Sequence, residues 1–364
     1  MTNRDIGFYR LSNQCIAGER FHRPEDVVRW MGALQAQDYI QAVWAMGLRT
    51  QSATLAAVEQ DIEDCKIIRT WPMRGTLHFI PPEDARWMLT LCASRMLAAD
   101  GRRMAQLELS VDIMTRCQDL FCRALSGGRR LSRPEMMALL EDAGISTAKQ
   151  RGYHILAYIA QSGVICLGPM QDKQQTFVLL DEWAPESRDL PHEEAVAELA
   201  RRYFSSHGPA TVHDFAWWAG ITVADARLGL EAAKPELISD AIEGKEYWMK
   251  EGASSPNRGD ESSVYLLPGF DEFLLGYKER SAVLSAERVQ KIVPGNNGVF
   301  LPMIVVAGQV EGTWKRILNR KAVEITLHPF APLGYLEDKA VEAAKSYADF
   351  IGLPLSLKTA SATP

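Results

Sequence analysis

Hydrophobic positions in the first part of the chain recur with two different periods. After Pro24, Val27, Trp30, Met31 and Leu34 are spaced i, i+3, i+4 and i+7, which places them on one face of a helix. Further on, over Thr76–Ile80, apolar and polar side chains alternate, with Leu77 and Phe79 in one set and Thr76 and His78 in the other. This pattern predicts a strand with His78 on its polar face.

Three stretches, beginning near Arg23, Ser132 and Thr211, share the pattern of a short helix, a tight turn and the start of another helix. Ser132 and Thr211 are each followed three residues later by an acid, Glu135 and Asp214, as in a capping box. Gly144 and Gly220 stand where a left-handed residue ends a helix. The repetition predicts a tandem array of helix-turn-helix units.

The elements expected around these units define an α+β fold that is mainly α. We predict helices over 5–17, 82–103, 111–126, 149–162, 193–205, 223–233 and 337–351, and strands over 67–69, 76–80, 164–167, 175–180, 264–267, 301–306, 309–316 and 322–328. Together they predict three tandem winged-helix modules, a C-terminal β-rich part and a final helix. The expected segments are 1–103, 104–185, 186–250 and 264–356, with a mobile linker over 251–263 and a disordered tail after Leu357.

Composition narrows the class of protein. The chain has 364 residues, 47% of them hydrophobic, and a net charge of −6, which counts against a protein coated in nucleic acid. Residues 101–170 are locally basic, with nine Arg and Lys against six Asp and Glu. The six cysteines include no Cys-x-x-Cys pair, and no apolar run approaches the roughly 20 residues of a membrane span. We expect a cytoplasmic protein with no metal site.

The first of the three turns carries Leu34-Gln35-Ala36-Gln37-Asp38. In an extended or turn segment, side chains two apart can point the same way, so Gln35 and Gln37 could act together. A glutamine amide donates and accepts hydrogen bonds but takes no proton, so the pair could orient a water molecule or a polar substrate without being a general base. The alternative is that both glutamines cap helix ends.

Several separated motifs resemble the AlkZ/YcaQ family of winged-helix DNA glycosylases from about residue 7 to 352. They are Gly32-Ala33-Leu34-Gln35-Ala36-Gln37-Asp38, Arg74-Gly75-Thr76-Leu77-His78, His207-Gly208-Pro209-Ala210-Thr211 with Asp214-Phe215-Ala216-Trp217-Trp218, Pro268-Gly269-Phe270-Asp271-Glu272 and Gly276-Tyr277. The resemblance implies tandem winged helices that remove alkylated purines from double-stranded DNA. It also implies that Gln35 and Gln37 form the catalytic motif, in the Gln-x-Gln form of the AlkZ branch, which acts on crosslinked purines as well.

That chemistry requires no strong base, because alkylation at N7 or N3 makes a purine cationic and a good leaving group. The remaining tasks are to place a water molecule against the sugar carbon and to stabilise an oxocarbenium-like transition state. No lysine stands in the motif, so we expect hydrolysis without a Schiff-base step, no cofactor and a monomeric enzyme.

Other side chains are weaker candidates. Asp38 could be a base but suits a helix N-cap. His207 and His213 lack a fitting third metal ligand. Trp217 and Trp218 suit a core, and Asp271 and Glu272 form a carboxylate pair without an evident mechanism. For DNA contacts we select residues of the first predicted wing and of the basic segment: Arg74, His78, Arg102, Arg103, Arg129, Arg130 and Arg133.

Two other functions fit the same fold, since winged helices are mostly binding modules. A regulator without catalysis would need a basic helix, over 149–162 or 223–233, to enter a major groove. The second of these has Arg227 as its only basic residue, against Asp225 and Glu231. A protein scaffold would have no salt-dependent DNA affinity, whereas an enzyme would need Gln35 and Gln37 exposed on a concave basic surface.

Overall fold

The computed structural model describes residues 1–252 and 262–360, so most of the predicted linker lies outside the described residues. The chain forms two compact units. Unit 1 comprises Met1–Val58, Ala197–Trp218 and Val223–Pro364, and unit 2 comprises Glu59–Val196 with Ala219–Thr222. Unit 1 therefore joins the beginning, middle and end of the sequence, while the four-segment division stays a prediction.

The N-terminal helices of unit 1 follow the predicted pattern. Helix α1 (Asn3–Asn13) begins at a capping box between Thr2 and Asp5. Helix α2 (Pro24–Met31) buries Val27 and Met31 and ends at Gly32, whose φ of 75° favours glycine. The short strand β1 (Leu34–Gln35) and helix α3 (Tyr39–Leu48) follow. The sequence pattern did not predict helix α4 (Leu55–Glu63), which comes next.

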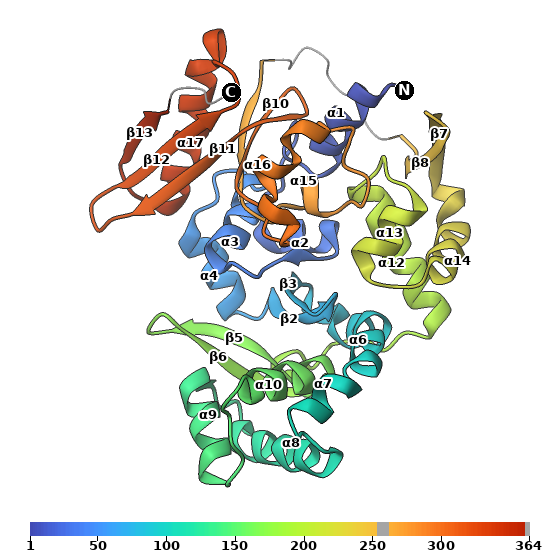
Figure 1. Cartoon of the computed structure of the whole chain (residues 1–364), viewed down its shortest axis with the longest axis vertical. Coiled ribbons are helices and arrows are strands. Elements are labelled where there is room, and N and C mark those ends of the chain that lie inside the picture. Colours follow the sequence, from blue (N-terminus) through green and yellow to red (C-terminus); the bar gives the residue numbers. More distant parts are fainter. Residues whose placement is uncertain (253–261, 361–364) are drawn as a thin grey trace. The chain divides into compact units, whose positions relative to one another are not determined.

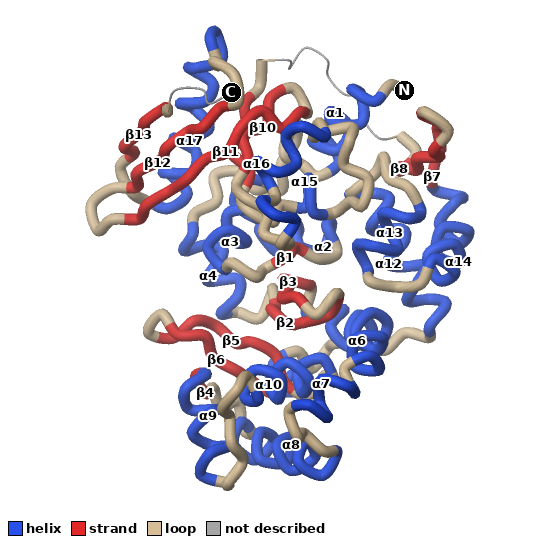
Figure 2. Tube along the Cα trace, in the orientation of Figure 1, coloured by secondary structure: helices blue, strands red, loops and turns tan. Residues whose placement is uncertain are grey.

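Five strands of unit 2 are hydrogen-bonded side by side in the order β3-β2-β5-β6-β4. Two hairpins meet among these strands, and Arg69 of one is paired with Leu167 of the other. Their strands are β2 (Ile68–Met73), β3 (Thr76–Ile80), β5 (Ile165–Gln171) and β6 (Gln174–Leu179), and the short β4 (Leu131–Ser132) lies at the edge. Figure 2 shows β5 and β6 as a hairpin with helix α10 (Arg151–Gln161) beside it.

The helices of unit 2 confirm one prediction and correct another. The capping box of Ser132 and Glu135 opens helix α9 (Arg133–Asp142), after helix α8 (Val111–Leu125). The predicted helix from Pro82 to Arg103 is interrupted, because a π-helical segment over Leu89–Ala93 adds a residue to one turn. The pieces around it are a 3₁₀ turn (Pro82–Asp84) and helices α5 (Ala85–Met88), α6 (Ser94–Ala99) and α7 (Gly101–Gln106).

The third predicted helix-turn-helix has its expected helices and hairpin. Helices α12 (His192–Ser206), α13 (Val212–Ala219) and α14 (Val223–Ala233) precede strands β7 (Leu237–Ile242) and β8 (Lys245–Lys250). Thr211 and Asp214 exchange the bonds of the predicted capping box. Helix-turn-helix stretches followed by hairpins thus occur as predicted, and their assignment as winged helices stays a prediction.

The C-terminal part of unit 1 is a five-stranded sheet with the order β13-β12-β11-β10-β9. Helix α17 (Glu337–Ile351) packs against it (Figure 1), where the rings of Trp314 and Tyr347 lie 5.1 Å apart. The strands are β9 (Val264–Leu267), β10 (Met303–Val306), β11 (Gln309–Leu318), β12 (Val323–Pro329) and β13 (Leu355–Thr359). The expectation of disorder directly after Leu357 is wrong, because β13 pairs in parallel with β12 through Thr359.

Across residues 1–252 and 262–360, no helix combines the length and the apolar character needed to cross a bilayer. All six cysteines are free thiols. Burial raises the pKa of Cys15 to about 11 and that of Cys92 to about 12, so these thiols are poor nucleophiles at neutral pH.

Candidate active site

The glutamine loop, which we define as Gln35–Asp38, lies between the end of α2 and the start of α3. Asp38 is the N-cap of α3, and its carboxylate accepts a hydrogen bond from the backbone nitrogen of Gln41 at 3.2 Å. This confirms the capping prediction for Asp38. Gln37 is exposed, whereas the Gln35 side chain is only 8% exposed, so Gln37 alone meets the exposure that an enzyme would require of both glutamines.

A buried glutamate holds the main chain of this loop. Glu272 begins the short helix α15 (Glu272–Leu275), and its side chain is 1% exposed. One carboxylate oxygen accepts a hydrogen bond from the Gln35 backbone nitrogen at 3.0 Å. The other accepts a hydrogen bond from the indole nitrogen of Trp218, also at 3.0 Å. Glu272 therefore fixes the glutamine loop to α15 and α13.

His207 completes the surroundings of Glu272. Its Nε2 atom lies 3.6 Å from the Glu272 carboxylate, and its ring stacks on Tyr203 with centroids 4.8 Å apart. Burial lowers the pKa of His207 and outweighs the opposing effect of the Glu272 carboxylate, so the imidazole is neutral at pH 7. His213, the other histidine near this turn, is exposed. Within the described ranges, no three His, Cys, Asp or Glu residues are grouped to hold a metal ion.

The residue before Glu272 belongs to a second buried contact. The carboxylate of Asp271 accepts two hydrogen bonds from the Arg49 guanidinium, at 2.8 and 2.9 Å, and both side chains are fully buried. Arg49 also donates to the carbonyl of Ala45 and to the side chain of Gln14. Asp271 in turn caps α15 by accepting a hydrogen bond from the Phe273 backbone nitrogen. The pair thus fixes the start of α15, where Glu272 lies.

Of Arg49, Asp271 and Glu272, the sequence marks only the two acids as candidates, and it does not reveal their partners. Asp271 and Glu272 stand out as a carboxylate pair in the sequence, but their partners are 222 and 237 residues away. Arg49 carries no signal of its own, because it lies one residue beyond the end of α3 in an ordinary polar context. Their positions follow from the packing of unit 1 and not from a local pattern.

The first predicted DNA contacts lie on the β2–β3 hairpin of unit 2. Arg74 is half-buried in the turn, and one of its terminal nitrogens is 3.4 Å from Nε2 of His78. The placement of His78 on a solvent-facing polar set is wrong, because its side chain is completely buried and its Nδ1 lies 2.9 Å from the Thr76 carbonyl oxygen. Strand β3 is buried on both faces after Thr76, so its alternation does not separate core from solvent.

The five remaining arginines differ in what they contact. Arg103 donates to Gln150 at 2.8 Å, and Arg129 donates to the Arg123 carbonyl at 2.6 Å. Arg130 pairs with Glu63 and lies over the Trp183 ring. In contrast, Arg102 and Arg133 are exposed, and neither guanidinium has a hydrogen-bond partner among the residues that the structure describes. Of the seven candidates, Arg102 and Arg133 therefore have the most accessible guanidinium groups for binding a phosphate.

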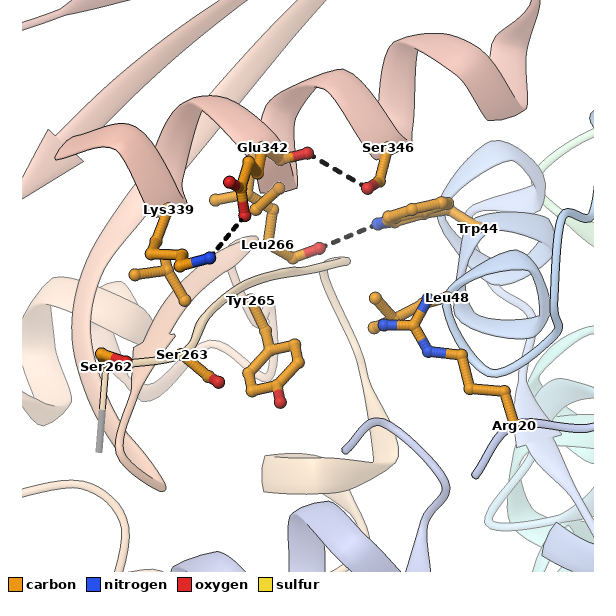
Figure 3. Close-up of a pocket in the computed structure, with 12 residues that line it drawn as sticks. Arg20, Trp44, Leu48, Ser262, Ser263, Tyr265, Leu266, Lys339, Glu342 and Ser346 are labelled. Atoms are coloured by element: carbon orange, nitrogen blue, oxygen red, sulfur yellow. Dashed lines mark hydrogen bonds and ion pairs between the residues drawn. The ribbon is translucent and has the colours of Figure 1, made fainter. Parts of the chain in front are cut away.

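A hollow of about 310 Å³ lies elsewhere in unit 1, between α3, β9 and α17 (Figure 3). Tyr265 and Ser263 line it, and the indole of Trp44 donates to the Leu266 carbonyl at its edge. Lys339 on its wall is paired with Glu342 at 2.9 Å. Arg20 also lines the hollow, so this ion pair leaves one positive charge on the wall.

Most of the chain matches a family of DNA glycosylases. The family model described as DNA glycosylase AlkZ-like matches residues 28–350, a range that includes the glutamine loop, Arg49 and the Asp271–Glu272 pair. The protein therefore belongs to the AlkZ-like family of DNA glycosylases.

Two comparisons with individual proteins agree with this assignment. The chain is 27% identical over 358 residues to an interstrand DNA cross-link repair glycosylase of Streptomyces sahachiroi, with 93% of each sequence covered. Its structure is similar to that of Streptomyces sahachiroi DNA glycosylase AlkZ, with a TM-score of 0.79 at 22% identity, over 98% of this chain and 99% of that one. The second comparison establishes a common fold of mixed helices and strands.

Proposed function

We propose that this DNA glycosylase hydrolyses the N-glycosidic bond of purines alkylated at N7 or N3 in double-stranded DNA, using a water molecule positioned by Gln35 and Gln37. The observation that carries the proposal is the anchoring of the glutamine loop. Its main chain is bonded to the buried Glu272 carboxylate, while Gln37 is exposed. A fixed backbone with an accessible amide is what a water-positioning loop requires.

The chemistry of the amide suits a cationic leaving group. Since the alkylated base leaves without prior protonation, the protein need not supply a strong acid or base. An amide oxygen can accept a hydrogen bond from the attacking water and can face the positive charge that develops on the sugar. Asp38 is engaged as the N-cap of α3, which leaves the amides as the candidate groups of the loop.

The proposal also covers crosslinked substrates, the contacts with DNA phosphates, the cellular compartment and the oligomeric state. The Streptomyces sahachiroi relative is named for interstrand cross-link repair, and this supports crosslinked purines as substrates here. Arg102 and Arg133 are the proposed phosphate contacts, with Arg74, Arg103, Arg129 and Arg130 as secondary ones. Six free thiols are typical of a reducing compartment, which supports a cytoplasmic enzyme. We propose that it acts as a monomer.

The products of the reaction test the proposed hydrolysis. Duplex DNA carrying a single N7-methylguanine should yield the free base and an unbroken strand with an abasic site. Because the glutamine loop contains no lysine, sodium borohydride added during the reaction should trap no protein–DNA adduct. A glycosylase that forms such an adduct serves as the positive control. Detection of a borohydride-stabilised adduct with this protein would contradict hydrolysis by water.

A further inference from the structure

Unit 1 contains a second hollow, of about 470 Å³, beside the elements that anchor the glutamine loop. We call it the α13–α16 hollow, because Trp217 of α13 and Val289 of α16 (Val289–Ile292) both line it. Lys278, Arg280 and Phe300 also line it. Its volume lies within the range of about 300–1,000 Å³ that is typical of pockets for small ligands.

Arg280 is held rigidly in this hollow. Its guanidinium carbon lies 4.9 Å from the ring centre of Trp217 and 4.9 Å from that of Phe300. Its Nε donates a hydrogen bond to the Leu274 carbonyl at 2.9 Å. Both aromatic contacts are within the distance at which a cation is attracted to a ring face. The side chain therefore presents a positive charge in a fixed position between two aromatic walls.

The charge of the hollow is positive although the whole protein is acidic. Among the described residues, Lys278 and Arg280 are the only charged ones that line it, and no carboxylate does. Glu279, which lies between them in the sequence, is not a lining residue, and its carboxylate accepts hydrogen bonds from Lys245 and from Ser281, which does line the hollow. The exposed Lys278 ammonium forms no ion pair among the residues that the structure describes. In a chain with a net charge of −6, such a site selects for an anion.

The hollow is connected to the glutamine loop through two short helices. On α13, Trp217 lines the hollow while the adjacent Trp218 donates to Glu272. On α15, Glu272 binds the Gln35 main chain while the carbonyl of Leu274 holds Arg280. The hydrogen bond from Trp218 to Glu272 joins α13 directly to α15. A ligand in the hollow would thus be positioned by the same helices that position the loop.

We propose that the α13–α16 hollow binds one nucleotide of the DNA substrate, with its phosphate at Lys278 and Arg280 and its base or sugar against Trp217 and Phe300. A nucleotide combines the two properties of the hollow, because it carries one negative charge next to a flat apolar surface. The inference rests on the proposed function, since it takes DNA as the partner. It gives the protein a nucleotide-binding site that is separate from the glutamine loop.

Equilibrium binding to a fluorescein-labelled duplex with a tetrahydrofuran abasic site tests the inference without base release. Lys278→Gln should weaken binding severalfold, and the slope of log K against log salt concentration should become shallower by about 0.9, as for one lost phosphate contact. Trp217→Leu should weaken binding about fivefold or more with no change in slope, because it removes a stacking surface and no charge. Lys345→Gln, at an exposed position of α17, is the matched control and should bind like the wild type.

The outcomes separate this inference from the proposed function. If Lys278→Gln equals Lys345→Gln in both affinity and salt slope, the hollow is not a nucleotide site, even if the wild type releases N7-methylguanine. If Lys278→Gln weakens binding as expected but the wild type releases no base, the proposed glycosidic hydrolysis is refuted and the nucleotide-binding site is supported. Absence of any salt-dependent binding by the wild type would overturn both. Thermal melting of each variant confirms that the fold is retained.

Discussion

Replacing Arg49 by methionine is expected to lower the free energy of unfolding by about 3–5 kcal/mol, because the Asp271 carboxylate would remain buried without its cation. The two side chains are fully buried and joined by two hydrogen bonds, so no solvent can take the place of the guanidinium. The side-chain oxygen of Gln14 would lose its donor as well, while its nitrogen would still donate to the Tyr277 hydroxyl. Urea denaturation followed by tryptophan fluorescence measures the change.

An exposed arginine–aspartate pair provides the control for this prediction. Arg23 is bonded to Asp26 at 2.9 Å, but its side chain is 64% exposed. Arg23→Met should therefore change the free energy of unfolding by less than about 1 kcal/mol. The double variant Arg49→Met with Asp271→Leu should recover part of the loss, since it removes both buried charges. Equal stability of Arg49→Met and Arg23→Met would contradict the structural role given to Arg49.

Glu272→Gln is expected to slow base release at saturating DNA by about tenfold to a hundredfold while DNA affinity changes little. The carboxylate accepts hydrogen bonds from two N–H donors, one from Gln35 and one from Trp218. A glutamine amide has one oxygen and one NH₂ group. Either the Gln35 N–H or the Trp218 N–H would therefore face the NH₂ group and lose its hydrogen-bond acceptor. The main chain at Gln35 would then no longer be held in place.

Single-turnover release of N7-methylguanine, measured together with DNA binding by anisotropy, distinguishes positioning from general damage to the fold. Glu135→Gln is the control, because Glu135 is an exposed capping-box glutamate of α9 in unit 2. It should release base at the wild-type rate. A purely structural Glu272 would reduce the folded fraction and the apparent binding capacity together, leaving the rate per bound complex unchanged. That result would refute positioning by Glu272.

Local features of the fold could be predicted because their causes lie within a few residues. Ser132 and Thr211 cap their helices through acids three positions later, and Asp38 caps α3 through Gln41. Strand pairing and burial depend on distant parts of the chain and were harder to predict. The final strand β13 has little periodic signal, yet it pairs with β12 over Val323–Leu327. His78 has a polar side chain, but β3 is buried on both faces.

The candidate site shows the same division between local and distant causes. The glutamine loop was visible in the sequence because a tight turn and its motif are contiguous. The group that holds it was not, since Glu272 reaches Gln35 only through the packing of α15 in unit 1. For the same reason, no sequence pattern marks the α13–α16 hollow, whose walls come from Trp217, Lys278, Arg280 and Phe300.

The most direct test of the central proposal is the single-turnover rate of N7-methylguanine release by Gln37→Ala. The proposed role of Gln37 predicts a rate at least about a hundredfold below the wild type, as for loss of one preorganised polar group, with unchanged affinity for the abasic duplex. Gln118→Ala, at an exposed position of α8, should retain the wild-type rate. Wild-type release by Gln37→Ala would contradict hydrolysis at the glutamine loop and would place the chemistry elsewhere in the protein.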